Sequence, residues 1–286
     1  MSGPRWSVVV PSYDRPEELA RLLGALSRLQ VPAGGLEVLV VDDGGRRPAA
    51  DVVARVPTPH RVRVHRQPNA GPAAARNAGA ARAEGELLAL TDDDCAPTPG
   101  WLTALEPHLH ADDVLVGGRT VNALRENLYA EATQSLVSTL VEPAPGRAPT
   151  FFPTCNLAVR THSFAATGGF DESFPRAAGE DRAFCDAWRA AGGTLVHEPG
   201  AVVEHAHALT LRGFWRQHRG YGAAAPAVHR RRAAAGLLDA GHEPPDFFWR
   251  LLTRPLREQP LPRAVPVLAL VGLSQVATAA GRWRAR

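Results

Sequence analysis

Short apolar runs alternate with helical patterns along the first 120 residues. The Val- and Leu-rich runs are typical of strands buried on both faces of a parallel sheet. The segments between them place apolar residues three and four apart, as in helices that cover such a sheet. The predicted strands are residues 7–11, 37–41, 62–65, 87–90 and 114–118, and the predicted helices lie around Leu19–Leu26, over 72–83 and over 99–110. This alternation predicts an α/β fold with a doubly wound parallel sheet.

The pattern is weaker beyond residue 118. Residues 119–150 are less regular, and within them we expect a loop over residues 143–149. The remaining predicted elements are a strand over 151–159, a helix over 182–191 that ends at Gly192-Gly193, a short strand over 202–207, and helices from Leu211 onward. Asp14 and Glu17 resemble a capping box before the first helix.

The stretch 264–280 is 17 residues long and weakly apolar. A spanning helix needs roughly 20 residues of stronger apolar character. The flanking Arg263, Arg282, Trp283 and Arg284 are typical of a helix that lies in a membrane interface. A helix packed on its own domain, or on a second subunit, fits the pattern equally well.

The charge of the chain is distributed unevenly. Residues 1–200 carry 19 Arg and 24 acidic residues, whereas residues 201–286 carry 13 Arg and 5 acidic residues, and the chain contains no Lys. A basic C-terminal region indicates an anionic partner such as a membrane surface, or a solvated basic face. The cluster Arg230–Arg232 is short and has few aromatic neighbours, so we expect no nucleic-acid partner.

The three cysteines are Cys95, Cys155 and Cys185. Their odd number and wide spacing indicate neither a disulfide framework nor a CxxC site. A reducing cytoplasm fits this pattern, and no signal peptide is recognisable at the N-terminus.

Acidic residues follow two of the predicted strands. Asp92-Asp93-Asp94 ends the strand over 87–90, and Asp42-Asp43 ends the strand over 37–41. In open α/β sheets, ligands bind beyond the carboxyl ends of the strands. Carboxylates this close repel one another unless a cation neutralises them, and Mg²⁺ takes carboxylate and phosphate oxygens. The alternatives are a solvated acidic turn for the first cluster and an ordinary Asp-Gly turn for the second.

Three further groups carry candidate chemistry. Arg76 and Asn77 lie one turn into an Ala-rich helix, where they can face a nucleotide, or they belong to an ordinary Ala-rich helix without a ligand. The pair Glu180-Asp181 offers a general base with a raised pKa, or a helix N-cap. His205 offers an imidazole ligand for Mn²⁺, or a structural histidine.

The ordered set of motifs resembles family 2 glycosyltransferases of the GT-A fold. The resemblance runs over roughly residues 5–207 through VVVPSYDRPEEL, EVLVVDDGG, NAGPAAARNAGAARAEGELLALTDDD, TCNLAVRTHSFAATGGFDESF, GEDRAFCDAWR and VEHAH. It implies a Rossmann-like, doubly wound, mostly parallel GT-A sheet with a helical C-terminal appendage. The implied division is a catalytic domain over 1–208, followed by a basic, partly apolar helical region over 209–286. Within the catalytic domain, residues 1–118 form a nucleotide-binding half and residues 119–208 form an acceptor or catalytic half.

The resemblance also implies a role for each site residue. The implied nucleotide-binding residues are Pro11, Tyr13, Asp43, Arg76, Asp92 and Asp93. Tyr13 would stack on the base, and Asp43 would accept a hydrogen bond from the base. Arg76 would lie near the base or the phosphates, and Asp92 or Asp93 would contact the ribose. The implied metal ligands for Mn²⁺ or Mg²⁺ are Asp94 and His205. Asp181 of the Glu180-Asp181 pair is the implied catalytic base, and Thr154 and Asn156 fall near the donor-sugar and acceptor pocket.

The implied activity is that of an inverting, metal-dependent hexosyltransferase. Its donor is a nucleotide-diphosphate sugar, with a UDP-sugar favoured, and its acceptor is a lipid-linked, polysaccharide or natural-product hydroxyl. We expect a cytoplasmic protein that can lie peripherally at the inner face of the membrane. The alternatives are a non-catalytic or a retaining GT-A protein that binds a sugar nucleotide. A nucleotidyltransferase is disfavoured because the first turn is not Gly-rich and Lys is absent.

Overall fold

A single mixed sheet forms the centre of the molecule. The computed structural model describes residues 3–174, 179–234, 236–237 and 245–285. The strands are β1 (Trp6–Ser12), β2 (Leu36–Asp42), β3 (Arg61–Arg66), β4 (Leu87–Leu90), β5 (Cys95–Pro97), β6 (Val114–Asn122), β7 (Leu157–Arg160) and β8 (Thr194–His205). Their order across the sheet is β3-β2-β1-β4-β7-β6-β8-β5.

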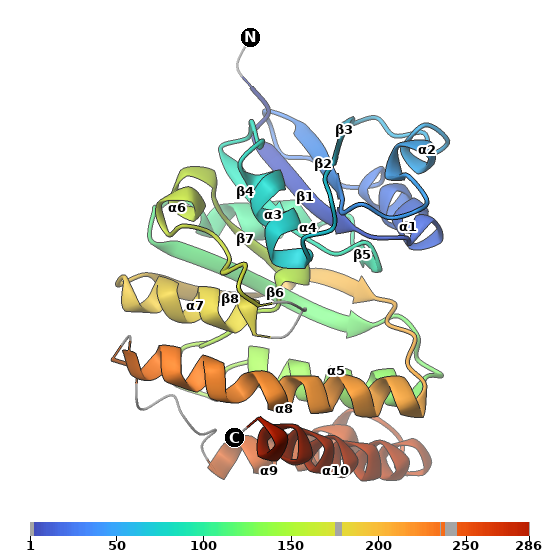
Figure 1. Ribbon diagram of the computed structural model, residues 1–286, viewed down its shortest axis with the longest axis vertical. Helices are drawn as coiled ribbons and strands as arrows, with labels where there is room; N and C mark the ends of the chain where they lie inside the picture. Colours follow the sequence, from blue (N-terminus) through green and yellow to red (C-terminus); the bar gives the residue numbers. More distant parts are fainter. Residues whose placement is uncertain (1–2, 175–178, 235, 238–244, 286) are drawn as a thin grey trace.

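Helices surround this sheet on both faces and extend below it (Figure 1). The α-helices are α1 (Pro16–Leu26), α2 (Ala49–Val53), α3 (Pro72–Ala80), α4 (Trp101–Leu105), α5 (Leu128–Val141), α6 (Thr161–Ala166), α7 (Glu180–Ala190), α8 (Leu211–Ala234), α9 (Pro245–Glu258) and α10 (Leu261–Arg284). Two short 3₁₀ helices are η1 (Glu106–His108) and η2 (Thr154–Asn156).

The first four strands of the chain are mutually parallel. β1 pairs in parallel with β2 and β4, and β2 pairs in parallel with β3. Beyond β4 the sheet becomes mixed, because β7 is antiparallel to both β4 and β6. The predicted α/β fold with a mostly parallel sheet is confirmed, and the carboxyl ends of β1, β2 and β4 lie at one edge as expected.

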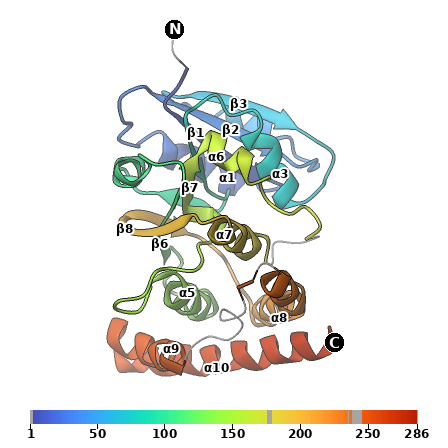
Figure 2. The same ribbon diagram turned by 90° about the vertical axis from the view of Figure 1, so that its left-hand side faces the viewer.

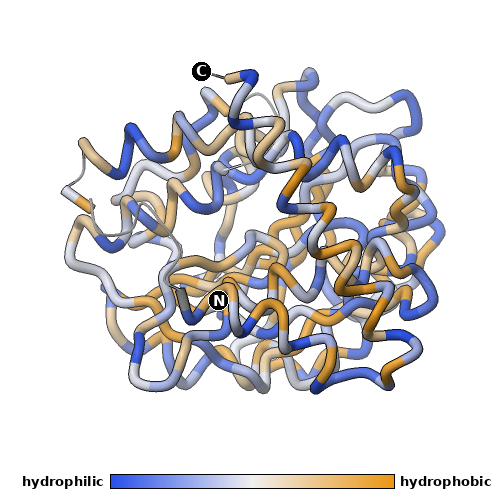
Figure 3. The backbone as a smooth tube through the Cα atoms, turned by 90° about the horizontal axis from the view of Figure 1, so that it is seen from below, coloured by the Kyte–Doolittle hydropathy of each residue, from blue (hydrophilic) through white to orange (hydrophobic). Residues whose placement is uncertain are grey.

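Both faces of the sheet are buried, as the apolar runs predict. On β1, Val8 and Val10 pack into one hydrophobic cluster with α1, α2 and α4. Val9 points the other way, into a second cluster with α3, α6 and α7. Figure 2 shows α3, α6 and α7 together on this second face, and Figure 3 shows hydrophobic segments running through the interior of the molecule. The alternation of side chains along each strand therefore builds two cores from one apolar run.

A third core lies among the C-terminal helices. Phe214 of α8, Phe247 and Leu251 of α9, and Val267 and Val271 of α10 pack together with α5. In Figure 1, α9 and α10 form the lowest layer, beneath α5 and α8. The helices expected from Leu211 onward are present.

Several local predictions are wrong. Within the less regular residues 119–150, the loop expected over 143–149 is present, but the helix α5 was not predicted, because small and hydroxyl side chains on more than one side of it are buried. The strand expected over 151–159 is confined to β7, and the strand expected over 202–207 is the end of the longer β8. The helix expected over 99–110 is only α4 followed by η1, and β5 was not predicted.

The predicted capping box is also absent. Arg15 occupies the N-cap position of α1, and no side chain caps the helix. Asp14 instead adopts a positive φ of 54° and accepts a hydrogen bond from the backbone N–H of Arg47 (2.9 Å). The turn after β1 is thus fixed by the loop after β2 rather than by its own helix.

Two glycines allow α8 and α10 to approach closely. A Cβ at Gly222 would collide with the backbone carbonyl of Thr278, and a Cβ at Gly281 would collide with the backbone carbonyl of Arg219. The backbone atoms that these two positions face cannot move aside without bending a helix. Glycine is therefore required at both positions for this packing.

We expect Gly281→Ala to lower the free energy of unfolding by about 1–3 kcal/mol, since the added methyl group overpacks a helix contact. Gly272→Ala on the same helix is the matched control, because its Cβ meets no atom within 4 Å. That control should stabilise the helix by about 0.5–1 kcal/mol. Urea denaturation, monitored by circular dichroism, measures the free energy of unfolding of both variants. Equal effects of the two substitutions would contradict the close packing of α8 on α10.

Candidate functional site

The turn after β1 and the acidic cluster after β4 meet at the carboxyl edge of the sheet. Ser12 Oγ donates a hydrogen bond to Asp93 Oδ2 (2.9 Å). Arg15 Nη1 donates to Asp93 Oδ1 (3.1 Å) and to Asp94 Oδ2 (2.9 Å). Burial raises the pKa of Asp93 to about 6, because Arg15 offsets only part of the desolvation. The juxtaposition expected from the parallel strand order is present.

Asp94 also faces the end of β8. His205 Nε2 lies 3.2 Å from Asp94 Oδ1. Although burial disfavours charge at both groups, the contact with His205, helped by Arg15, keeps the pKa of Asp94 well below its usual range. The same carboxylate raises the pKa of His205 to about 9, against the effect of burial. Residues more than 100 positions apart in the chain thus form one charged pair.

The donor set around Asp94 fits a divalent cation. The ligand atoms of Asp94, Cys95 and His205 all lie within 4.8 Å of one another. Carboxylate oxygen and imidazole nitrogen suit Mn²⁺ and related ions, and the thiol of Cys95 adds a softer atom. The two residues predicted as metal ligands are therefore placed where a single ion can reach both.

Arg76 connects the acidic cluster to α7. Its guanidinium is buried, since the residue is only 3% exposed. Nη2 donates to Asp92 Oδ1 (2.6 Å), and Nη1 donates to Glu180 Oε1 (3.3 Å). Both terminal nitrogens bind carboxylates of the protein, and the predicted contact of Arg76 with base or phosphates stays a prediction. Arg76 bridges the end of β4 and the first turn of α7.

The acidic pair at the start of α7 has raised pKa values. Burial, followed by the neighbouring charge of Asp181, raises the pKa of Glu180 to about 7, while Arg76 acts in the opposite direction. Burial also raises the pKa of Asp181, whose Oδ1 accepts a hydrogen bond from the backbone N–H of Arg182 (2.7 Å). Glu180 is buried, whereas Asp181 is half-buried. Asp181 lies inside the helix, and Gly179 occupies the N-cap position.

The predicted base-binding residues lie on the neighbouring strand ends. Tyr13 follows β1 and is 50% exposed, and Pro11 is half-buried near the end of β1. Asp43 is buried and accepts hydrogen bonds from Gln67 Nε2 (2.8 Å) and from the backbone N–H groups of Ala70 (3.0 Å) and Gly71 (2.9 Å). Both oxygens of Asp43 therefore hold the loop that leads into α3.

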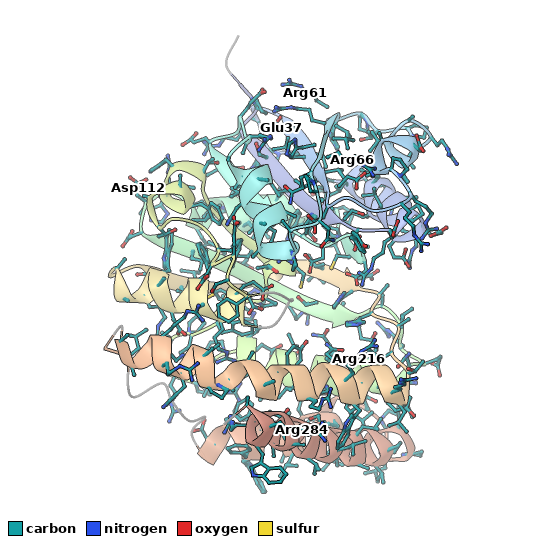
Figure 4. All side chains as sticks on the ribbon, viewed as in Figure 1. Glu37, Arg61, Arg66, Asp112, Arg216 and Arg284 are labelled. Atoms are coloured by element: carbon teal, nitrogen blue, oxygen red, sulfur yellow. The ribbon has the colours of Figure 1, made fainter. Side chains whose placement is uncertain are left out.

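The preceding residue, Asp42, is used in a similar way. Its carboxylate accepts hydrogen bonds from the backbone N–H of Ala49 (3.0 Å) and from Arg66 Nη1 (3.0 Å), a side chain labelled in Figure 4. The Asp42-Asp43 pair thus shapes the loop after β2 and the loop after β3.

Asn156 does not lie in an open pocket. It is completely buried in η2, where its Oδ1 accepts from Trp101 Nε1 (2.8 Å) and its Nδ2 donates to the carbonyl oxygens of Arg119 (3.1 Å) and Ala201 (2.9 Å). This differs from the predicted position near the sugar pocket, because every polar atom of the amide is already bonded to the scaffold. Thr154 is buried in the same turn.

Asn77 differs from its predicted position in the same way. Its Nδ2 donates to the carbonyl oxygen of Phe170 (2.9 Å), and its Oδ1 accepts from the backbone N–H of Phe170 (2.9 Å). Asn77 therefore fixes the segment before α7 rather than facing a ligand.

Two contributors to the site were not predicted. Arg15 binds Asp93 and Asp94, and its position in the turn SYDRPEE was the only available signal. Tyr221 of α8 lies within electrostatic range of Asp181 and Glu180, and its hydroxyl accepts a hydrogen bond from Gln217 Nε2 (2.6 Å). No sequence pattern marks Tyr221, because only the packing of α8 brings it near α7.

Comparisons with known proteins agree on one family. The sequence model of glycosyl transferase family 2 matches residues 7–169. The chain is 32% identical over 255 residues to the pre-mycofactocin glycosyltransferase of Mycobacterium tuberculosis, in a match that covers 84% of this chain and 52% of that protein. The chain spans about half the length of the curated relatives it matches.

Solved structures share the fold at low identity. The mannosyltransferase PcManGT from Pyrobaculum calidifontis, in complex with GDP-Man and Mn²⁺, matches with a TM-score of 0.68 at 18% identity and covers 98% of this chain and 87% of that one. Residues 1–349 of TarS from S. aureus, in complex with UDP-GlcNAc, match with a TM-score of 0.57 at 17% identity, over 96% of this chain and 81% of that one.

We expect Arg76→Met to lower the free energy of unfolding by about 3–5 kcal/mol at pH 8, because it leaves the buried Glu180 and the half-buried Asp92 without their partner. At pH 5.5 the loss should be smaller: below its raised pKa of about 7, Glu180 binds a proton and no longer needs the cation. Urea denaturation at the two pH values measures this difference.

The matched control is Arg82→Met just beyond α3, where the arginine is exposed. This substitution should change the free energy of unfolding by less than about 0.5 kcal/mol. A loss for Arg76→Met that is the same at both pH values would contradict a bridge between ionised carboxylates.

Proposed function

The chain belongs to glycosyl transferase family 2, and on this premise we propose that it transfers a sugar from a nucleoside-diphosphate donor to an acceptor hydroxyl with inversion at the anomeric carbon. The observation that carries the proposal is the connected network Asp94–Arg15–Asp93 and Asp92–Arg76–Glu180. It joins the strand edge where a donor binds in open α/β sheets to an acidic pair that can accept a proton.

The donor lies over the ends of β1, β2 and β4 in this proposal. The exposed ring of Tyr13 offers a stacking surface for the base. The loop held by Asp43 forms the neighbouring wall, and Asp92 or Asp93 contacts the ribose. Solved structures of the same fold contain GDP-Man or UDP-GlcNAc, which supports a nucleoside-diphosphate sugar as donor. We favour a UDP-sugar.

Asp94 and His205 would hold a divalent cation, Mn²⁺ or Mg²⁺. A bound ion of this kind supplies positive charge that stabilises the leaving diphosphate. The structural relative PcManGT is in complex with Mn²⁺, which supports this choice. Arg15, half of whose side chain is exposed, can move away from Asp93 and Asp94 when other positive charge arrives.

Asp181 is the proposed general base. Glu180 is buried and paired with Arg76, so the more accessible carboxylate of the pair is Asp181. Asp181 takes the proton of the acceptor hydroxyl as that oxygen forms its bond to the anomeric carbon. The bond from the anomeric carbon to the diphosphate oxygen breaks, and the nucleoside diphosphate leaves with the electron pair. One displacement of this kind inverts the anomeric centre.

Arg76 serves as a positioning residue in this mechanism. Its two ion pairs fix the start of α7 relative to the end of β4. It therefore sets the distance between base and donor and limits how far the pKa of Glu180 rises. A raised pKa keeps Asp181 basic enough to accept a proton near neutral pH.

The proposed organisation follows the predicted divisions. Residues 1–118 supply the donor side, residues 119–208 supply the base and the metal-binding histidine, and residues 209–286 add a basic helical region. The acceptor is a lipid-linked, polysaccharide or natural-product hydroxyl, and the protein acts in the cytoplasm at the inner face of the membrane. The basic charge of the last region supports this location.

Asp181→Asn should lower the rate of sugar transfer by roughly 10²–10⁴-fold while leaving donor binding intact, because the amide cannot accept the hydroxyl proton. The measurement is transfer of labelled sugar with saturating donor, with the anomer of the product determined for the native protein. Glu172→Gln, an exposed acid on the segment before α7, is the matched control and should transfer at the native rate. Near-native transfer by Asp181→Asn, or a product of retained configuration, would contradict the proposed mechanism.

A further inference from the structure

The outer face of α10 is apolar and has no partner among the described residues. Its exposed large side chains are Leu261, Val265, Val276 and Trp283, of which Trp283 is 78% exposed. No charged residue occurs between Arg263 and Arg282. The face therefore continues without a charge over about 27 Å of helix, since each residue adds 1.5 Å.

The neighbouring helix α9 extends this surface. Phe248, Trp249, Leu252 and Leu256 are exposed, and Trp249 is 67% exposed. The opposite side of α9 is buried against α5 and α10. Figure 1 shows α9 and α10 in the lowest layer, and Figure 3 views the molecule from that side. The outer sides of the two helices form one surface, which we call the α9–α10 face.

A helix with the length and composition of α10 can cross a membrane, as its mean hydropathy of 1.7 over the most apolar window shows. In this fold, however, α10 is docked along α8 through the close contacts at Gly222 and Gly281. Thr278 Oγ1 also donates to the carbonyl oxygen of His218 (3.3 Å). A spanning helix would lose these contacts, so the packing favours a helix that stays on the domain.

Positive charge borders the α9–α10 face at both ends of α10. Arg257 lies near its start, and Arg282 and Arg284 lie near its end, where Figure 4 labels Arg284. None of the three has a carboxylate within ion-pair distance among the residues that the structure describes. The two described acids of α9 and α10 are already paired, Asp246 with Arg147 and Glu258 with Arg254. The border is thus a net positive field around an apolar centre.

This charge pattern distinguishes between two possible partners of the face, a second copy of the chain and an anionic lipid surface. If two copies met face to face, arginines at the ends of one α10 would meet arginines at the ends of the other in either direction of packing, and like charges would repel. An anionic lipid surface instead attracts the arginines and accepts the apolar centre. Exposed tryptophans are also typical of helices at the level of the lipid headgroups.

We propose that the α9–α10 face binds the surface of an anionic bilayer, with α10 lying in the plane of the membrane. Phe248, Trp249, Val276 and Trp283 enter the boundary between headgroups and acyl chains. Arg257, Arg282 and Arg284 bind lipid phosphates.

Sedimentation of the purified full chain with vesicles tests the proposal without any activity readout. The chain is mixed with phosphatidylcholine vesicles, or with the same vesicles containing about one third phosphatidylglycerol, at low and high salt. The bound fraction should be high only with phosphatidylglycerol and should fall at high salt, because exposed charges are screened. Tryptophan emission should shift to shorter wavelength on binding.

Substitutions on the α9–α10 face test the contribution of its apolar centre and that of its bordering arginines separately. Trp283→Glu or Val276→Glu should weaken vesicle affinity roughly tenfold or more, because each places an acid in the apolar centre. Arg282→Glu and Arg284→Glu should each weaken it on the order of five-fold or more. The matched controls are Leu211→Glu, an equally exposed apolar residue at the start of α8, and Arg55→Glu, an exposed arginine after α2. Neither control should change vesicle binding, and circular dichroism checks that every variant is folded.

Three results would overturn the proposal. The first is equal or absent binding to both kinds of vesicle by the folded chain. The second is a dimer, detected by light scattering, that Val276→Glu converts to a monomer while vesicles bind neither form, since the face would then serve a second copy. Resistance of the bound native protein to extraction with alkaline carbonate would also overturn it, because α10 would then span the bilayer.

Discussion

The site depends on the repulsion among carboxylates that the fold brings to one edge of its sheet. Asp92, Asp93 and Asp94 follow β4, and Glu180 and Asp181 begin α7. At short range and in a partly buried setting, these charges destabilise the fold unless positive charge lies between them. Arg15, Arg76 and His205 supply that charge. The positions of these carboxylates are therefore held by their cations, and the chemistry of the site follows from this arrangement.

The cations also connect parts of the chain that are distant in sequence. Arg76 ties α3 to β4 and α7, and His205 ties the end of β8 to β4. A second buried pair continues this connection, because Arg232 of α8 binds both carboxylate oxygens of Asp186 on α7 (2.6 and 3.0 Å). Since α8 packs closely on α10, the helix that carries the proposed base is joined to the α9–α10 face through the Arg232–Asp186 ion pair and the contact of α8 with α10. A protein held on a membrane by that face would keep its site at a fixed orientation to the bilayer.

The sequence predicted those features that depend on local periodicity. Apolar runs such as residues 7–11 revealed the parallel strands, and strand order then placed Ser12 beside Asp93. It did not reveal features that depend on packing between distant segments. The helix α5 lies between two cores and so lacks a single apolar stripe, and Tyr221 comes within electrostatic range of Asp181 only because α8 packs on α7. Asn77 and Asn156 looked like ligand contacts, yet their amides satisfy backbone groups that the sequence alone does not locate.

The central claim is that Asp94 helps to form a joint site for a divalent cation and a nucleoside diphosphate. Thermal unfolding of the native chain and of Asp94→Asn, with UDP or GDP in the presence and absence of Mn²⁺, tests it most directly. Asp51→Asn on the exposed surface of α2 serves as the control. A ligand that binds only the folded state raises the melting temperature by mass action. We predict a rise with one nucleotide that requires Mn²⁺ in the native and control proteins and disappears in Asp94→Asn. No rise with either nucleotide in a folded native protein, or an equal rise in Asp94→Asn, would contradict it.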